Sequence, residues 1–367
     1  MAKIVIDARE LRTSTGRYVE RLLHYLQNID TDNDYAVLLK PKDVAGWIPT
    51  NPKFKAVACP HKEFTFDEQL GFKKQLDEIG ADLVHFGMVQ QPVLYSGKVV
   101  TTIHDLTTVR FINPDKNPYV LKAKQQVYKQ VIKRAARKSL AVITPSEFVK
   151  KDLVDFTGIK PEIVTVTYES ADPITETPEI VRGLEGSKYI MYIGRPTPHK
   201  NLERLIEAFV VLQKDNPSLK LVLAGKKDAN YQRVEQGVAQ RGIENVVFTD
   251  FVSEGQLRWL YENCQAYVFP SLSEGFGLPG LEAMIHGAPV VSSNATCLPE
   301  IYGDAAHYFD PLDVNAIAKA ISEVLTGSSL RETLIARGHQ QVTKYSWQSM
   351  AKQTLAIYNS IIYKSTP

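Results

Sequence analysis

Two glutamates and two basic residues in the second half of this 367-residue chain suit a ligand that combines phosphate with hydroxyl groups. Glu274 and Glu282 lie in the segment EGFGLPGLE, and Arg195 and Lys200 lie in GRPTPHKN. An arginine can bind two phosphate oxygens at once, and a lysine supplies a compact positive charge. A carboxylate repels phosphate but accepts hydrogen bonds from hydroxyl groups. Together these residue types predict a site for a sugar nucleotide.

The two glutamates lie in a stretch that reads as a strand, a loop, a helix and a second strand, from Ala266 to Asn294. Pro279 suits the first turn of the helix, and Gly287 can end it. In parallel α/β sheets ligands bind at the carboxyl ends of strands. We therefore expect binding at the loop Ser271–Gly277 and at the start of the helix that follows it, where backbone amides favour an anion.

The two cations are expected in the same kind of place. They follow a strand candidate at Tyr189–Ile193 and precede an amphipathic helix that begins near Leu202. A cation pair at the carboxyl end of a strand and the N-terminus of a helix can hold a diphosphate. Taken alone, the two residues are equally well explained as exposed cations without a ligand.

The glycine-rich loop has two other interpretations. Gly275–Gly280 also matches the dinucleotide-binding pattern G-x-G-x-x-G. That pattern belongs in the first strand-turn-helix of a domain and is followed by an acidic residue after the next strand, whereas the next strand here ends in Ser292–Asn294. The other interpretation is a surface loop in which Glu274 and Glu282 are merely solvated.

The first half of the chain alternates strand-like and helix-like segments, which predicts a doubly wound α/β sheet. Strands are expected at 3–8, 35–39, 54–58, 83–86, 99–103, 141–144 and 163–167, and helices near 17–26, 67–78, 119–137 and 146–155. His104 and Asp105 end the run VVTTIHD, so they are expected at the carboxyl edge of this sheet. Position alone favours a local hydrogen-bonding role for His104.

EGFGLPGLE and GRPTPHKN, together with the Ile-His-Asp segment, resemble the retaining glycosyltransferases of the GT-B group, family 4 type (glycosyl transferases group 1). The resemblance covers nearly the whole chain. It implies two Rossmann-like doubly wound domains that face each other across a cleft. The implied divisions are an acceptor-binding domain at 1–170, a nucleotide-sugar-binding domain at 171–345, and a helix at 346–367 that crosses back to the first domain.

The resemblance also implies roles for individual residues. Arg195 and Lys200 would stabilise the leaving nucleoside diphosphate, Glu274 would orient the sugar, Glu282 would hold the ribose, and His104 would position the sugar near the reacting carbon. Further donor contacts are expected from Gly16, Val252, Gly275, Phe276, Gly277 and Leu278. The family often has two glycines ahead of the Arg-Tyr pair, and this chain has only Gly16 before Arg17 and Tyr18.

The activity that follows is retaining, metal-independent transfer of a hexosyl unit from a nucleotide sugar to a glycan or lipid-linked acceptor, as in polysaccharide biosynthesis. The form of the motifs is most similar to mannosyltransferases that use GDP-mannose. Two alternatives stay open: a sugar-nucleotide epimerase on the same fold, and a nucleotide-sugar-binding protein without turnover.

Bulk properties narrow the class of protein. A net charge of +2 argues against a nucleic-acid-binding protein. Cys59, Cys264 and Cys297 are far apart, which favours a reducing compartment over a disulfide framework or a zinc site. The start MAKIVIDAR has no leader pattern, so the cytoplasm is expected. Asp30–Asp34 follows a helix and is interpreted as a solvated turn, not as a metal-binding Asp-x-Asp; no cofactor or metal is expected.

A basic helix near 119–138 has two competing uses. It places Leu121, Val127, Val131 and Ala135 on one face, with lysines and arginines mostly elsewhere. Such a helix can lie on anionic lipid at the inner membrane face, or its charged side can simply be solvated while its apolar side covers the sheet. Ser146, in TPSEF, is expected to cap the next helix.

Overall fold

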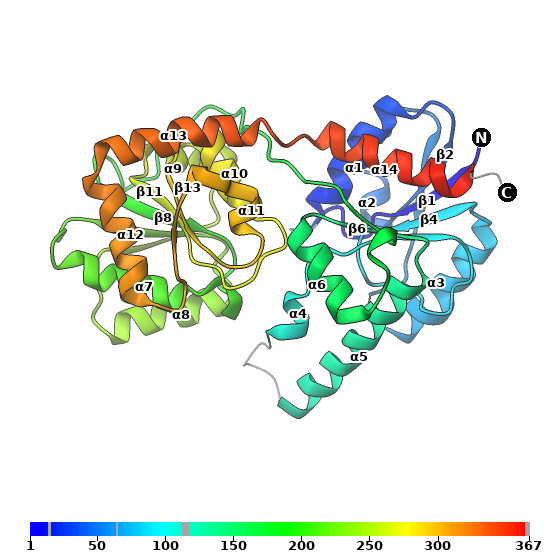
Figure 1. Cartoon of the computed structure of the whole chain (residues 1–367), viewed down its shortest axis with the longest axis horizontal. Coiled ribbons are helices and arrows are strands. Elements are labelled where there is room, and N and C mark those ends of the chain that lie inside the picture. Colours follow the sequence, from blue (N-terminus) through cyan, green and yellow to red (C-terminus); the bar gives the residue numbers. More distant parts are fainter. Residues whose placement is uncertain (14–15, 64, 112–117, 364–367) are drawn as a thin grey trace. The chain divides into compact units, whose positions relative to one another are not determined.

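The computed structural model describes residues 1–13, 16–63, 65–111 and 118–363, with the backbone alone described at 118–123 (Figure 1). The chain divides into two compact units. Unit 1 consists of Met1–Val109, Lys116–Glu169 and Ser346–Pro367, and unit 2 consists of Arg110–Asp115 and Ser170–Tyr345. Each unit is built on one parallel β-sheet.

The sheet of unit 1 has the strand order β3-β2-β1-β4-β5-β6-β7, with neighbouring strands parallel. Its strands are β1 (Lys3–Asp7), β2 (Asp34–Leu39), β3 (Phe54–Ala58), β4 (Leu83–Phe86), β5 (Val99–Thr102), β6 (Ala141–Thr144) and β7 (Val164–Val166). Continuous apolar runs such as Ile4–Ile6 are fully buried, because helices cover both faces of a parallel sheet.

Helices pack on both faces of this sheet. They are α1 (Arg17–Ile29), α2 (Pro41–Val44), α3 (Phe66–Ile79), α4 (Thr107–Arg110), α5 (Pro118–Lys138), α6 (Glu147–Thr157) and α14 (Trp347–Ile362). Alternate residues of β4 point to opposite faces: Val84 packs in a cluster with Phe72 of α3, whereas His85 bonds to Tyr358 of α14. Helix α14 lies beside α1 (Figure 1).

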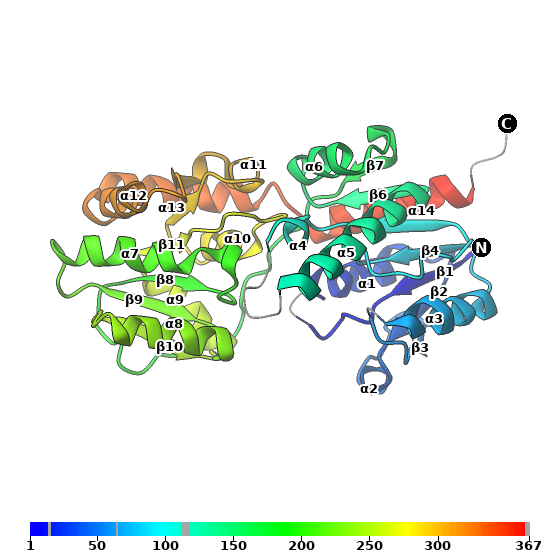
Figure 2. The same cartoon turned by 90° about the horizontal axis from the view of Figure 1, so that it is seen from below.

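Unit 2 repeats this design with the strand order β10-β9-β8-β11-β12-β13, and Figure 2 shows β8, β9 and β10 side by side. Its strands are β8 (Tyr189–Ile193), β9 (Lys220–Ala224), β10 (Val246–Asp250), β11 (Ala266–Phe269), β12 (Val290–Ser293) and β13 (Ala306–Phe309). Its helices are α7 (Leu202–Gln213), α8 (Ala229–Gln240), α9 (Glu254–Asn263), α10 (Leu278–Ile285), α11 (Leu298–Tyr302), α12 (Val314–Thr326) and α13 (Ser328–Val342). The predicted doubly wound α/β fold is confirmed.

Both sheets contain a point at which the chain changes direction across the sheet. In unit 1 this point lies between β1 and β4, and in unit 2 it lies between β8 and β11. At such a switch point the loops leaving two adjacent strands turn to opposite faces, so a crevice opens at their carboxyl ends. The fold therefore marks one binding region in each unit.

One predicted helix cap is confirmed, and the predictions for a turn and for helix α5 hold only in part. The side chain of Ser146 caps α6, as expected. The turn at Asp30–Asp34 is partly solvated: Thr31 and Asp32 are exposed, whereas Asp30 is 3% exposed and accepts hydrogen bonds from Asn33 and from the hydroxyl of Tyr35. This buried carboxylate satisfies the backbone N–H groups of the turn between α1 and β2.

The apolar face of α5 also differs from the expected one. Val127 is 64% exposed, and the helix buries Ile132, Ala135 and Ala136 against the sheet. Successive residues of a helix are 100° apart, so a small shift in register moves the buried stripe to a different face. The mixed sequence of α5 did not determine which face is buried. The side chain of Leu121 lies outside the described residues.

Candidate functional site

Two of the predicted site residues meet at the switch point of unit 2. The Nζ atom of Lys200 lies 2.6 Å from Oε1 of Glu274, and both side chains are largely buried. Lys200 ends the short 3₁₀ helix Pro198–Lys200 after β8, and Glu274 follows β11. The two residues are 74 positions apart in the chain, and the pairing of β8 with β11 brings them together.

The loops that carry this pair are tied to each other by hydrogen bonds. Asn201 has a left-handed backbone (φ 60°) between the 3₁₀ helix and α7, and its side-chain amide donates to the carbonyls of Pro270 and Pro311. The N–H of Leu272 donates to the carbonyl of His199. A buried Asn that bridges three loops fixes their positions before any ligand binds, which reduces the entropy lost on binding.

Arg195 lies in the same loop as Lys200 but faces solvent. Its side chain is exposed, and within the part of the chain that the structure describes its guanidinium has no hydrogen bond or ion pair to another residue. A free guanidinium keeps its paired donors for a diphosphate. The structure thus places Arg195 and Lys200 in the same β8–α7 loop, with the lysine already engaged by Glu274.

The glycines of the β11–α10 loop have a structural explanation. Gly277 caps α10 with a left-handed backbone (φ 96°) and its carbonyl accepts a hydrogen bond of 2.6 Å from the hydroxyl of Tyr302. A Cβ atom at Gly277 or at Gly280 would overlap that hydroxyl. These two glycines therefore allow α10 to pack closely on Tyr302, and the match to a dinucleotide fingerprint is incidental.

The remaining donor-binding predictions fall around this loop. Phe276 is 4% exposed and packs edge-on against Tyr345, so a ligand contact at Phe276 is expected from its backbone. Glu282 lies on the first turns of α10, half-buried, with the hydroxyl of Tyr261 at 3.5 Å. Val252 follows β10, which lies two strands away from β8. Gly275 is buried and Leu278 is half-buried.

His104 lies in unit 1, just after β5, and both nitrogens of its ring face acceptors. Nδ1 is 3.1 Å from Oε1 of Glu169, and Nε2 is 3.0 Å from the carbonyl oxygen of Gly87. A carboxylate and a carbonyl only accept hydrogen bonds, so both ring nitrogens must donate and the imidazolium form is favoured. Burial alone lowers the pKa of His104, but the hydrogen bond and the charge of Glu169 raise it above its ordinary value.

The sequence interpretation missed Glu169, which holds His104 in this state. Glu169 is 6% exposed and follows β7 at the carboxyl edge of the sheet. An acidic residue at a predicted strand end could have been noticed there. The ring of Tyr18, with its centroid 4.8 Å away, packs edge-on against His104.

The predicted ligand glycine in unit 1, Gly16, is explained by local packing. It precedes α1, and a Cβ atom there would overlap the carbonyl oxygens of Glu10 and Leu11. The glycine is needed for this loop to fold back on itself. Its contact with the donor stays a prediction.

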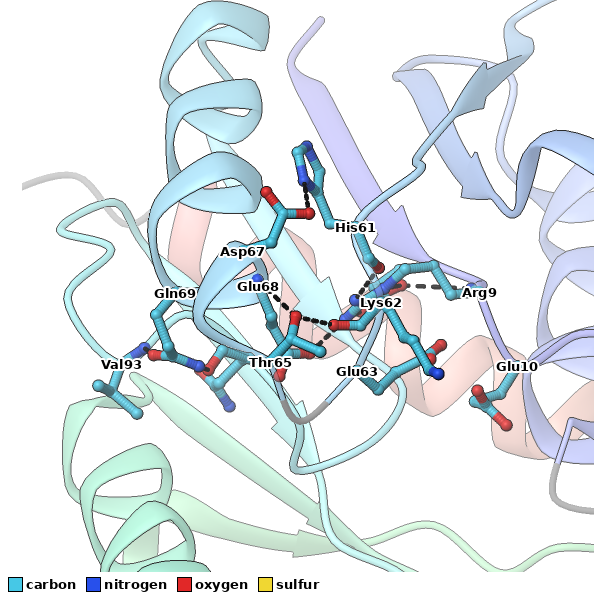
Figure 3. A network of polar contacts seen from close by, with 12 residues as sticks. Arg9, Glu10, His61, Lys62, Glu63, Thr65, Asp67, Glu68, Gln69 and Val93 are labelled. Atoms are coloured by element: carbon cyan, nitrogen blue, oxygen red, sulfur yellow. Dashed lines mark hydrogen bonds and ion pairs between the residues drawn. The ribbon is translucent and has the colours of Figure 1, made fainter.

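A second missed feature of unit 1 is a buried arginine after β1. Arg9 is 2% exposed; it donates from Nε and Nη2 to Asp7 at 2.9 and 2.8 Å, and from Nη2 to Glu68 at 3.0 Å. Its Nη1 donates to the carbonyl of His61 (Figure 3). Arg9 lies two residues after the end of β1, and its local sequence gave no signal for this role.

The part of the chain that the structure describes has neither a metal-ligand cluster nor a membrane-spanning helix. Among the described residues, no three His, Cys, Asp or Glu side chains lie close enough together to hold a metal ion. Over the same residues, no helix is both long and apolar enough to cross a bilayer. Helix α5, for which lipid contact is one of two competing interpretations, exposes Lys124, Val127 and Arg134.

Both halves of the chain match known glycosyltransferase families. Residues 15–173 match Glycosyltransferase Family 4, and residues 174–341 match Glycosyl transferases group 1. The O-antigen chain mannosyltransferase B of Escherichia coli is 33% identical over 274 residues, which cover 71% of this chain and 70% of that protein. The serotype-specific mannosyltransferase WbdA of Escherichia coli is 29% identical over 61% of this chain but only 29% of its own length.

Solved structures show the same fold over the full length of the chain. The sucrose-phosphate synthase from Thermosynechococcus elongatus has a TM-score of 0.79 at 18% identity and covers 100% of both chains. The Anabaena protein Alr3699/HepE, solved in complex with UDP and glucose, has a TM-score of 0.73 at 17% identity and covers 98% of this chain and 100% of that one. On its fold and its sequence, this chain belongs to the group 1, family 4 glycosyltransferases.

Proposed function

We propose that this glycosyltransferase transfers a hexosyl unit, with mannose from GDP-mannose as the first choice, to a glycan or glycolipid acceptor with retention of configuration. The observation that carries the proposal is the 2.6 Å contact between Lys200 and Glu274 at the switch point of unit 2. It joins a phosphate-binding and a hydroxyl-binding group in one place, as a sugar diphosphate requires. The mannosyltransferase names of the relatives support the choice of sugar.

In the proposed reaction the bond between the anomeric carbon and the diphosphate oxygen breaks, and negative charge develops on the leaving group. Arg195 and Lys200 stabilise that charge, which a divalent metal does in other enzymes. Glu274 then accepts hydrogen bonds from the sugar, and Glu282 from the ribose. Gly16, Val252 and the backbone of Gly275–Leu278 complete the donor site.

The acceptor oxygen attacks from the face that the diphosphate leaves, through an oxocarbenium-like state, and its proton passes to the departing phosphate oxygen. His104, as an imidazolium, positions the sugar. Its ring nitrogens are already engaged by Glu169 and by the carbonyl of Gly87. A sugar hydroxyl must therefore displace one of these partners or contact the edge of the ring. Trapping a glycosylated side chain as a competent intermediate would contradict this route.

The test is thermal stabilisation by a panel of nucleotide sugars, and hydrolysis of each, with EDTA present. We expect one donor to stabilise the native chain and to be slowly hydrolysed, and both effects to be lost in Arg195→Ala. The matched control is Arg241→Ala, an exposed arginine after α8 and before the amino end of β10, at the opposite edge of the sheet. Failure of every nucleotide sugar and nucleoside diphosphate to bind would refute the proposal, and NMR of the product would reveal epimerisation.

A further inference from the structure

A cavity of about 280 Å³ lies at the switch point of unit 1, at the carboxyl ends of β1 and β4. Its walls include Asp7, Glu10, Tyr18, Glu63, Gly87 and Gln90. Tyr18 and Gly87 are also the residues that contact His104, so the cavity adjoins the residue expected to position the transferred sugar. Ligand pockets usually measure about 300–1,000 Å³, so this cavity suits a small ligand such as one sugar residue.

The buried arginine beside this cavity is not available to bind a phosphate. Four of the five N–H groups of Arg9 are used by Asp7, Glu68 and the carbonyl of His61, and the guanidinium lies 4.2 Å from the ring of Phe72. Two carboxylates therefore face one cation, and this group keeps a net negative charge. Figure 3 shows Arg9 pointing into this network, and its side chain is buried.

A second charged group on the cavity wall also combines two carboxylates with one cation. Nζ of Lys40 lies 2.9 Å from Glu10 and 3.1 Å from Glu63, whose side chains are 26% and 16% exposed. In Figure 3 the carboxylates of Glu10 and Glu63 lie close to one another. Again two carboxylates share one ammonium group, and the exposed Lys62 is the cation that remains at the rim. An anionic ligand would meet excess negative charge on both walls.

The same walls offer hydrogen-bond acceptors with remaining capacity. Oε1 of Gln90 is buried, and among the described residues it has no hydrogen-bond partner. A buried acceptor without a donor is costly, and a ligand hydroxyl removes that cost. Carboxylate oxygens of Glu10 and Glu63 can accept further hydroxyl donors, because each oxygen has two lone pairs. The side chain of Tyr18 supplies an apolar wall.

We propose that this cavity binds the acceptor as an uncharged sugar residue, with Glu10, Glu63 and Gln90 accepting hydrogen bonds from its hydroxyl groups. Any phosphate of a lipid-linked acceptor must then lie outside the cavity. The inference rests on the proposed function, since it is the transferase reaction that requires an acceptor. It adds what the reaction alone does not give, namely the charge of the acceptor group and the residues that select it.

The test measures binding of neutral and phosphorylated sugars to the full chain by ligand-detected NMR, with methyl α-mannoside, methyl α-glucoside and mannose 1-phosphate as probes. A saturating nucleoside diphosphate is present throughout, so that Arg195 and Lys200 of unit 2 are occupied and do not bind the phosphate of the probe. We expect at least one methyl glycoside to bind about ten-fold or more tightly than the 1-phosphate. Glu63→Gln and Gln90→Leu should each weaken glycoside binding by about three- to ten-fold, the effect of one lost hydrogen bond. Glu63→Gln should also reduce the ratio between the affinity for the methyl glycoside and the affinity for mannose 1-phosphate.

The matched control is Glu78→Gln, a carboxylate of α3 that is 65% exposed and pairs with Lys74; it should bind like the native chain. The inference would be overturned if mannose 1-phosphate bound as tightly as the glycosides or if neither glycoside bound. It would also be overturned if both variants left glycoside binding unchanged. If nucleotide sugars still stabilise the same preparation, the transferase proposal survives that result. Glycoside binding without any nucleotide-sugar binding would instead overturn the acceptor role of the cavity.

Discussion

The contact between Lys200 and Glu274 joins two residues with opposite effects on a bound diphosphate. The lysine attracts the phosphate oxygens, whereas the glutamate repels them and competes for the lysine. Because both side chains are mostly buried, removal of one partner leaves the other charge incompletely compensated. The pair therefore predicts that its two members respond differently to substitution.

We expect Lys200→Met to lower the affinity for a nucleoside diphosphate by about ten-fold or more, from the loss of a charge-assisted contact. Glu274→Gln should keep or raise that affinity, since it frees the lysine, while transfer of the sugar falls. Isothermal titration with the nucleoside diphosphate and an assay of transfer separate the two effects. Lys319→Met, an exposed lysine of α12, is the control; a loss of affinity in Glu274→Gln would contradict the assignment.

His104 and Glu169 give a prediction about pH. The pKa of His104 is raised above 6.5, so its pairing stabilises the fold fully below pH 6.5 and the stabilisation is lost as pH rises through the folded-state pKa. In Glu169→Gln the amide removes the negative charge, and the pKa of His104 should fall. NMR titration, with the resonance assigned through His104→Gln, measures both values. An unchanged pKa in Glu169→Gln would show that the carboxylate does not hold the imidazolium.

The sequence predicted more of the site in unit 2 than of the site in unit 1, and the reason is physical. Arg195 and Lys200 lie in the loop after the apolar strand β8, and Glu274 lies in the loop after the apolar strand β11, so strand order alone places them at one sheet edge. Arg9 and Glu169 act through partners 59 and 65 residues away, Glu68 and His104. No local pattern encodes such long-range pairs. The cavity beside Glu63 likewise exists only once β3, β2, β1 and β4 have assembled in that order in the sheet.

At the scale of elements, α14 is joined to the sheet of unit 1 by a buried polar contact. Nδ1 of His85 on β4 lies 2.5 Å from the hydroxyl of Tyr358, and its Nε2 lies 2.8 Å from the hydroxyl of Thr102 on β5. Burial lowers the pKa of His85 to about 3, so the ring is neutral at ordinary pH. The hydroxyl of Tyr18 also contacts Thr102, so this chain of hydrogen bonds reaches the wall of the cavity.

We expect Tyr358→Phe to lower the free energy of unfolding by about 1–3 kcal/mol, because it leaves a buried nitrogen of His85 without its partner. Tyr363→Phe is the matched control, since its hydroxyl bonds to Asn33 but half of its side chain is exposed; its cost should stay below about 1 kcal/mol. Urea denaturation of both variants gives the comparison. Equal costs would mean that the His85 contact adds nothing to the attachment of α14.

Element boundaries were predicted well where a cap or a buried apolar run defined them. Ser253 and Gln256 form a capping box at the start of α9, and β8 and β3 begin and end at the expected residues. The prediction failed for α5, where the buried stripe of Ile132, Ala135 and Ala136 is short and alanine-rich. Alanine is compatible with either face of a helix, so only contact with the sheet decides which side is buried.

At the scale of the whole molecule, the chain passes from unit 1 to unit 2 after Glu169 and returns after Tyr345. Helix α14 thus lies in unit 1 although unit 2 precedes it in sequence, and it buries Trp347, Met350 and Tyr358 there. A division at residue 170 was implied by the family resemblance. Only the family resemblance predicted that the last helix packs on the first domain. An amphipathic pattern shows that a helix has a buried face, but it does not show which surface that face covers.

A chain that ends at Tyr345 should therefore destabilise one unit and spare the other. Without α14, His85 loses its contact with Tyr358 and α1 loses the helix that packs on it, whereas the core of unit 2 keeps its contacts. We expect hydrogen exchange, read by mass spectrometry, to quicken in β1 and β4 and to stay slow in β8 and β9. A chain that ends at Tyr363 is the control and should match the full chain. Equal loss of protection in both sheets would mean that the two units unfold as one, against the separate cores that the contacts define.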